Sequence, residues 1–201
     1  MAVVSIKNKL RRGNLLVGND PYIPTDFESI ATVTVGSGGA ANVEFTSIPS
    51  TFTHLQVRYI VRNNFSGSGS NFLEGQFNSD TGSNYAAHHL LGNGSSASAG
   101  SSSSRSTFRS GVVTTTYATP SAFSAGVIDI LDYANTNKYK TVRSLGGYES
   151  NASNTENGYA SLISSLWQNT NAITSIKLFN GNTGYNLVQY SHFALYGIKS
   201  A

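Results

Sequence analysis

The chain has 201 residues with a formal net charge of +3, and only 11% of them are charged, against about 25% in an ordinary soluble domain. Apolar residues make up 39% and aromatic residues 11%, which excludes the composition of a disordered chain and allows one domain with a sizeable core. There is no cysteine, which excludes disulfides, thiolate metal sites and cysteine nucleophiles.

Residues 1–29 contain a dense cluster of four basic residues. Lys7, Lys9, Arg11 and Arg12 lie close together before the first acidic residue, and the remainder of the chain is close to neutral. A basic nucleic-acid-binding face across the whole domain is therefore not expected. The basic cluster is interpreted either as a solvated tail or as part of an arm that binds an acidic protein surface.

The same segment contains small apolar groups between glycines and prolines, a pattern that argues against a long helix. Leu15, Leu16, Val17 and Tyr22 are too few and too interrupted to form a core of their own. We therefore expect an extended N-terminal arm over residues 1–29 that docks on a neighbouring protein through these side chains.

No stretch approaches the roughly 20 apolar residues of a membrane-spanning helix. The opening MAVVSIKNKLRRGNLLVG has its charges in the middle and lacks an apolar run, so no secretory signal is expected. These features predict a protein made in a cytoplasm that reaches its place of action by assembly or lysis, without membrane insertion.

From residue 30 to residue 201, short β-branched and aromatic runs alternate with turns rich in Gly, Ser and Asn. The clearest run is THLQVRYIVR at 53–62, in which apolar and polar residues alternate as in a half-buried strand. The pattern predicts about nine to eleven strands and no helix. They are expected at 30–35, 42–45, 53–62, 72–78, 85–92, 106–117, 123–133, 138–149, 158–168, 172–180 and 187–198.

The connections between these runs carry their own predictions. GSGGAA between 30–35 and 42–45 predicts a hairpin with a Gly-rich loop. Gly75 interrupts the run at 72–78 and predicts a bulge. The Ser-rich segment 92–106 has low sequence complexity and predicts a mobile surface loop.

Two facing sheets are the natural way to protect so many strand edges. An all-β, antiparallel β-sandwich of jelly-roll type is therefore predicted over residues 30–201, with another Greek-key sandwich as the alternative. No internal repeat of the kind found in propellers or β-helices is visible in the sequence.

No residue pattern predicts a catalytic centre or a metal site. His88 and His89 point to opposite faces of a strand, and His54 and His192 stand in other strands, so no three or four ligands converge. Asp129 is expected to pair with a basic residue on a neighbouring strand. The nearby Asp132 is expected to cap a turn rather than to complete a glycosidase pair.

Serine chemistry and phosphate binding are not indicated either. There is no G-x-S-x-G elbow, and the Gly-rich stretches lack both the lysine and the strand-to-helix setting of a phosphate loop. Trp167, Tyr148, Tyr159 and Tyr190 could form a stacking platform for a host glycan, although rings of this kind are more often core or interface residues of a sandwich. We expect no enzyme activity, no metal and no cofactor.

The order of several segments resembles a group of virion structural proteins of tailed bacteriophages, of the kind found in cyanophages. These segments are FTSIPSTFTHLQVRYIVR, GQFNSDTGSNYAAHHLLGNGSS, IDILDYANTNKYKTVRSLGGY, LWQNTNAITSIKLFNGNTG and FALYGI, with IKNKLRRGNLLVGNDPYIP resembling the N-terminal arm of phage particle components. The resemblance covers most of residues 45–198. It implies a jelly-roll-like domain on the outside of a virion, multimeric and without cofactor, and it transfers no active-site residue.

The leading interpretation is thus a non-enzymatic virion protein anchored by its arm to other capsid or tail components, as a homo-oligomer with a trimer favoured. It would serve host attachment as a short tail fibre or receptor-binding protein. One alternative is a capsid cement or decoration protein that stabilises the head. Two others of different class are a free carbohydrate-binding module and a depolymerising enzyme.

Overall fold

The computed structural model describes residues 26–67, 71–150 and 158–199. These residues form strands joined by turns and contain no helix, which confirms the predicted all-β fold. The first strand already begins at Phe27, slightly before the predicted domain boundary at residue 30.

The described residues form twelve strands. In chain order they are β1 (Phe27–Thr34), β2 (Asn42–Phe45), β3 (His54–Val61), β4 (Asn71–Phe77), β5 (Tyr85–Gly92), β6 (Ala97–Arg105), β7 (Phe108–Val113), β8 (Ser124–Leu131), β9 (Lys140–Tyr148), β10 (Tyr159–Trp167), β11 (Ile176–Asn180) and β12 (His192–Ile198).

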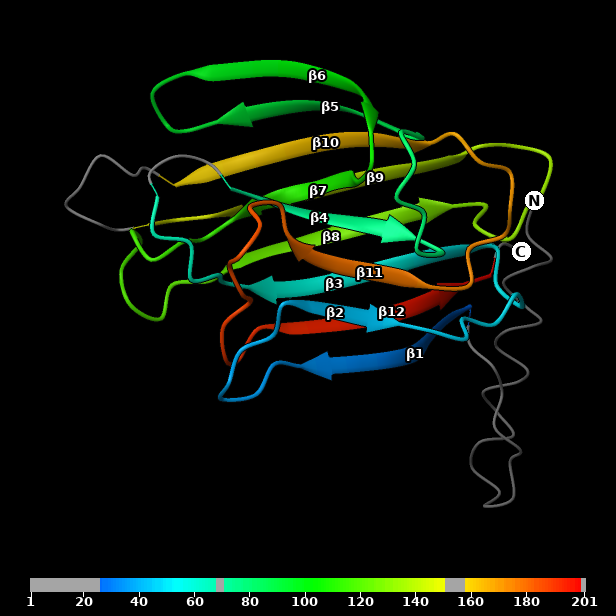
Figure 1. Ribbon diagram of the computed structural model, residues 1–201, viewed down its shortest axis with the longest axis horizontal. Coiled ribbons are helices and arrows are strands. Elements are labelled where there is room, and N and C mark those ends of the chain that lie inside the picture. The colour runs from blue at the N-terminus through cyan, green and yellow to red at the C-terminus, as the bar shows by residue number, and fades with distance from the viewer. Residues whose placement is uncertain (1–25, 68–70, 151–157, 200–201) are drawn as a thin grey trace, which may run out of the picture.

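The strands are arranged in two antiparallel sheets that face each other (Figure 1). The larger sheet has eight strands in the order β1-β12-β3-β8-β9-β10-β5-β6, and the smaller has four in the order β2-β11-β4-β7. In Figure 1 the smaller sheet lies in front, and β6 and β1 form the upper and lower edges of the larger sheet.

Four strand pairs are nested along the chain, as in an antiparallel ribbon rolled up on itself. In the larger sheet β1 pairs with β12 and β3 with β8, and in the smaller sheet β2 pairs with β11 and β4 with β7. This connectivity is that of a jelly roll, as predicted. The pairs β9–β10 and β5–β6 extend only the larger sheet, which therefore projects beyond the smaller one (Figure 1).

Alternation along β3 shows why these sequences form half-buried strands. Leu55, Val57, Tyr59 and Val61 are buried between the sheets, whereas Arg58 between them is exposed on the other face. Because successive side chains of a strand point to opposite faces, one strand serves both the core and the outer surface.

An aromatic cluster fills the core near the end of the smaller sheet. The rings of Phe77 and Phe108 stack with centroids 4.4 Å apart, and Tyr85 and Trp167 pack around them. A Cβ atom at Gly75 would lie 2.5 Å from the Phe108 ring, so this position has to be glycine for the ring to approach. The cluster ties β4, β5, β7 and β10 together across both sheets.

Three local predictions are corrected by the structure. The segments 27–34 and 42–45 do not form a hairpin, because β1 pairs with β12 in one sheet and β2 with β11 in the other. The segment 92–106 is not a loop throughout, because β6 pairs with β5 along its length. The irregularity expected at Gly75 lies between Leu73 and Glu74, where the register of β4 shifts against β7.

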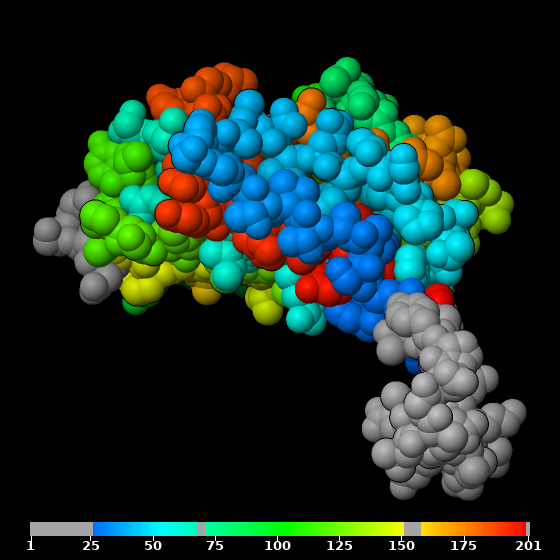
Figure 2. Space-filling view, turned by 90° about the horizontal axis from the view of Figure 1, so that it is seen from below, coloured from blue at the N-terminus to red at the C-terminus, as the bar shows by residue number. Residues whose placement is uncertain are grey.

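The first and last described residues are neighbours. The backbone N–H of Lys199 donates to the carbonyl of Asp26 at 2.9 Å, and the ammonium of Lys199 pairs with Glu28 at 3.0 Å. Figure 2 shows this side of the molecule, where β1 and β2, in blue, lie on the outside with β12, in red, beside them. The described chain therefore begins and ends close together, at the β1 edge of the larger sheet.

Candidate functional site

The face of the larger sheet that points away from the smaller sheet carries a row of apolar side chains. Val127 of β8, Leu145 of β9, Leu162 of β10 and Leu90 of β5 are consecutive cross-strand partners. The leucines at 145, 162 and 90 are 66%, 47% and 50% exposed. Large exposed apolar side chains that form one contiguous patch mark an interaction surface, and we refer to these four residues as the leucine ridge.

A second row runs beside the ridge on the same face. It lies two residues away from the ridge on each strand. It consists of Ala125, Gly147, Ala160 and Gly92, again paired across the strands. These side chains are a methyl group or a hydrogen atom, so the row is low beside the leucines. We refer to it as the small-residue trough.

The row on the other side of the ridge is polar, and three of its side chains form hydrogen bonds with one another. Gln56 donates to Asp129 at 2.9 Å, and Arg143 donates to the other oxygen of the same carboxylate at 3.3 Å. Ser164 and His88 continue the row on β10 and β5. The predicted pairing of Asp129 with a basic residue on a neighbouring strand is confirmed, and the ridge and the trough contain no charged side chain.

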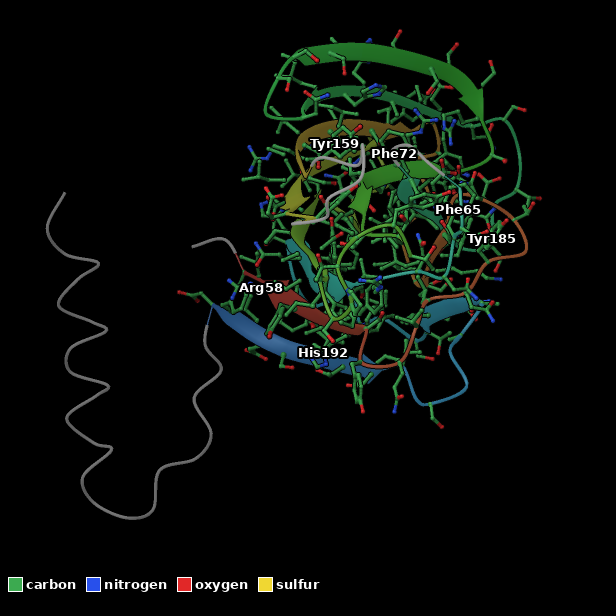
Figure 3. All side chains as sticks on the ribbon, turned by 90° about the vertical axis from the view of Figure 1, so that its left-hand side faces the viewer. Arg58, Phe65, Phe72, Tyr159, Tyr185 and His192 are labelled. Carbon is green, nitrogen blue, oxygen red and sulfur yellow. The ribbon has the colours of Figure 1, made fainter. Side chains whose placement is uncertain are left out.

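Arg58 ends the ridge row on β3, next to Val127. Its guanidinium lies 5.2 Å from the ring centroid of Phe27 and 5.5 Å from that of Tyr196, which are themselves stacked. Figure 3 shows Arg58 on the outer side of the larger sheet, whereas Phe65 and Tyr185 lie on the opposite side of the molecule.

The predicted docking residues of the arm cannot be placed in this structure. They lie outside the described residues, so their role remains the sequence-based prediction. The set comprises Lys7, Lys9, Arg11, Arg12, Leu15, Leu16, Val17 and Tyr22.

Trp167 is a core residue, which corrects its prediction as a glycan contact. It is 1% exposed, its indole N–H donates to Asp80 at 2.7 Å, and its ring packs against Phe77 and Tyr85. No ring face is left on which a sugar could stack.

Tyr148 and Tyr159 are brought together, with ring centroids 5.9 Å apart. They line an open pocket of about 520 Å³ at one end of β5, β9 and β10. Asn93 and Ser95 of the β5–β6 turn complete part of the wall. Of the four predicted stacking rings, these two therefore share a concave and partly polar site, whereas Tyr190 does not line it.

The histidines do not form a metal site. Among the described residues there is no group of three His, Asp or Glu side chains that could hold a metal ion. His88 is exposed, whereas His89 points to the inner side, where its ring packs against Phe72 with centroids 5.6 Å apart. Burial lowers the pKa of His89, helped by the positive charge of Arg109.

Asp132 has a different role from the turn cap that was predicted. Its carboxylate pairs with Lys138 and lies 3.5 Å from His54, and its own φ of 49° marks the turn after β8. The hydrogen bond from Lys138 outweighs partial burial and holds the pKa of this carboxyl below its usual value. Asp132 is thus paired with Lys138 at a strand end, away from the polar row that holds Asp129.

Lys140 is a fully buried cation whose contacts indicate a structural role. Its ammonium donates to the carbonyls of Asn135, Lys138 and Thr170 at 2.6, 2.9 and 2.9 Å. Burial lowers the pKa of Lys140, with the charge of Asp132 opposing the shift. Although a lysine with a lowered pKa can act as a nucleophile, this one has all three N–H groups engaged and no exposed surface.

Glu74 anchors a second internal polar cluster between β4, β6 and β7. It accepts hydrogen bonds from Arg105 and Thr107, both at 2.6 Å, and a longer one from Arg109 at 3.4 Å. The guanidinium of Arg109 also lies 4.3 Å from the ring centroid of Phe72. This carboxylate is neutralised within the sandwich, so it is a poor candidate for acid–base chemistry.

In the part of the chain that the structure describes, no helix is long and apolar enough to cross a membrane. A comparison with protein-family models, curated proteins and solved structures finds no match to this chain. The fold and the surface therefore define the class of molecule as an antiparallel jelly-roll sandwich with an open apolar sheet face.

The leucine ridge was not predicted from the sequence. Each strand sequence does contain the signal, because Leu145 and Leu162 occupy positions that alternate with buried residues. Whether these positions align depends on the register between neighbouring strands. That register pairs residues far apart in the chain, and no single strand sequence determines it.

Proposed function

We propose that this protein is a non-enzymatic structural component of a particle, built to assemble with other proteins through its surface. The observation that carries the proposal is the leucine ridge, which exposes three leucines on the open face of a rigid sheet. Leaving such a patch in water costs free energy of the order of 25 cal/mol per Å², so we infer that a partner covers it in the assembled state.

Following the resemblance of the sequence, we place this component on the exterior of a tailed-phage virion. The leading role is a short tail fibre or receptor-binding protein anchored by the part of the predicted N-terminal arm that precedes β1. The alternative is a cement protein that stabilises the head. The low fraction of charged residues, 11%, supports either role, since neutral polar surface is less costly to desolvate at protein contacts than ions are.

Quantification of the chain in purified particles tests the placement. The chain should co-sediment with intact particles after a high-salt wash. A copy number on the order of a dozen would indicate the tail, whereas hundreds would indicate the head, because the symmetry of each part fixes how many equivalent sites it offers. Absence of the chain from washed particles would contradict the proposal.

A truncated chain lacking residues 1–25 tests the arm separately. The whole described sandwich starts at residue 26, so the truncated protein should keep the thermal stability of the full chain and lose its place on particles. Normal occupancy of particles by the truncated chain would show that the anchor lies elsewhere.

A carbohydrate-binding module is the second candidate, and the pocket at Tyr148 and Tyr159 favours it. Aromatic rings beside amide and hydroxyl groups can bind the apolar face and the hydroxyls of a sugar. Binding of the full chain to a glycan array should then be lost in Tyr159→Ala. It should be kept in the control Tyr190→Ala, which removes a 69% exposed ring that does not line the pocket.

A further inference from the structure

We propose that the leucine ridge and the small-residue trough form a self-complementary surface through which two copies of this chain pair face to face. The inference rests on the proposed function, in that it assumes that the open sheet face is a contact surface. It adds the identity of the partner, which is a second copy of the same sheet.

The two rows are offset by two residues along each strand. On each of three strands the large side chain lies two residues from a small one: Leu145 from Gly147 on β9, Leu162 from Ala160 on β10 and Leu90 from Gly92 on β5. Because side chains of one face recur every second residue, the two rows are parallel and adjacent.

A two-fold axis that runs parallel to the rows and midway between them exchanges their places. Each ridge then lies opposite the trough of the other copy, so that Leu145 meets Gly147 and Leu162 meets Ala160. A two-fold contact of this kind uses the same patch on both copies. A ridge with a trough beside it satisfies that requirement without any change in shape.

The trough has room for a partner side chain at one end. Gly92 and Ala160 line the open pocket of about 520 Å³ described above, so the surface is hollowed there. In the proposed pairing, Leu90 of the second copy lies opposite Gly92 at that hollow.

Electrostatics favour a copy of this chain over a charged partner. The ridge and the trough have no charged side chain between β8 and β5, so pairing them leaves no buried charge unpaired. Arg143 and Asp129 are already paired in the neighbouring polar row, which would lie at the rim. A partner with a strongly charged surface would find no counter-charge in this patch.

The size of the patch sets the strength of the contact. Sheets twist by about 20–25° per strand, so only the central strands of two facing sheets stay in register. Four strands about 4.8 Å apart and about 24 Å long give on the order of 500 Å² per copy, below the roughly 800 Å² per partner of a standard interface. We therefore expect a weak dimer, with a dissociation constant on the order of micromolar.

Sedimentation equilibrium of the purified full-length chain over a wide concentration range tests the pairing. The native chain should pass from monomer to dimer as its concentration rises. Leu145→Arg places a charge in the centre of the ridge and should raise the dissociation constant by about 100-fold. Leu131→Arg is the matched control, because Leu131 of β8 lies on the same face of the sheet, outside both rows, and is 37% exposed. This variant should leave the dimer unchanged.

Ala160→Leu separates ridge-in-trough packing from general hydrophobic adhesion. The substitution adds exposed apolar surface, which would strengthen a non-specific contact, but it fills the trough and should weaken the specific dimer by about 10-fold. A tighter dimer in this variant would overturn the proposal. All variants should keep the circular dichroism spectrum and the melting temperature of the native chain, since the substituted side chains are exposed.

The experiments distinguish a failure of the proposed pairing from a failure of the proposed function. A native chain that stays monomeric into the high micromolar range, or one that forms trimers, would overturn the two-fold pairing. If Leu145→Arg nevertheless reduced the occupancy of particles, the open face would still be a contact surface, with a different occupant. If the chain were absent from washed particles but dimerised as described, only the proposed function would fail.

Discussion

The hydroxyl of Tyr59 lies in the middle of the sandwich and has no hydrogen-bond partner among the described residues. Burial raises the pKa of Tyr59 far above its ordinary value. Three glycines make the space for this hydroxyl: a Cβ atom at Gly111, Gly126 or Gly146 would lie 2.0, 2.3 or 2.8 Å from it. The buried hydroxyl therefore carries a desolvation cost that no described contact repays.

We expect Tyr59→Phe to leave the free energy of unfolding unchanged or to raise it. Tyr85→Phe is the matched control, because the hydroxyl of Tyr85 accepts a hydrogen bond from the N–H of Phe77 at 3.0 Å and donates to the carbonyl of Asp80 at 3.3 Å. Loss of these contacts should cost about 1–2 kcal/mol. Urea unfolding of both variants measures the difference, and an equal loss in the two would mean that Tyr59 has a partner.

Asp80 links the core tryptophan to a surface turn. Its carboxylate accepts hydrogen bonds from the indole of Trp167 at 2.7 Å, from the side chain of Asn84 at 2.9 Å and from the N–H of Gly82 at 2.8 Å. Burial alone would raise the pKa of this carboxyl, but the three hydrogen bonds outweigh it and hold the pKa below the usual value.

A carboxyl whose pKa is lower in the folded state stabilises the protein above its unfolded pKa, and this contribution is lost as the pH falls. The native chain should therefore be more stable than Asp80→Asn at neutral pH. The difference should shrink as the pH falls below about 4, the ordinary value for an aspartate, and through the lower pKa of the folded state. Thermal unfolding of both proteins at several pH values measures this, and a difference independent of pH would contradict the assignment.

At the scale of elements, the sequence predicted strands better than their partners. Ranges such as 42–45 and 85–92 match β2 and β5 because alternation and turn residues are local signals. The partner of a strand is non-local: β1 pairs with β12 at the other end of the chain, so the Gly-rich segment after it was wrongly expected to close a hairpin. The core position of Trp167 depends on the same long-range pairing, through β5 and β9 on either side of β10.

The strand β6 was missed because its sequence, ASAGSSSSR, has few of the residues that favour strands. This strand is stabilised instead by its backbone hydrogen bonds to β5. The turn between β5 and β6 is closed by Asn93, whose side-chain oxygen accepts hydrogen bonds from the N–H groups of Ser95 and Ser96. Its other edge has no neighbouring strand among the described residues, because β6 is the last strand of the larger sheet.

We therefore expect β6 to open more readily than the inner strands of the larger sheet. Its amide protons should exchange at least about 100-fold faster than those of β9 and β10, which are paired on both sides, because local opening near a sheet edge needs less free energy than global unfolding. Hydrogen exchange of the isolated chain measures this. Equal protection of β6 and β9 would mean that another segment covers the β6 edge.

At the scale of the whole molecule, the rolled-up ribbon buries one face of the larger sheet and leaves the other open. The four added strands widen the open face, and three of them, β9, β10 and β5, supply the three leucines of the ridge. The jelly roll itself could be built from the nested pairs alone. The main effect of the extra pairs is therefore to enlarge the outer surface. This effect is consistent with the proposed role of the protein as an assembly component.

The most direct test of this account is oxidative footprinting of Leu90, Leu145 and Leu162 in purified particles and in the dilute isolated chain. If the open face is a contact surface, the three leucines should be oxidised several-fold more slowly in the particle, whereas the exposed ring of Tyr190, which belongs to neither row, serves as the reference. Equal oxidation of the leucines in both states would show that the open face stays in water, and the account of this protein as an assembly component that works through that face would be wrong.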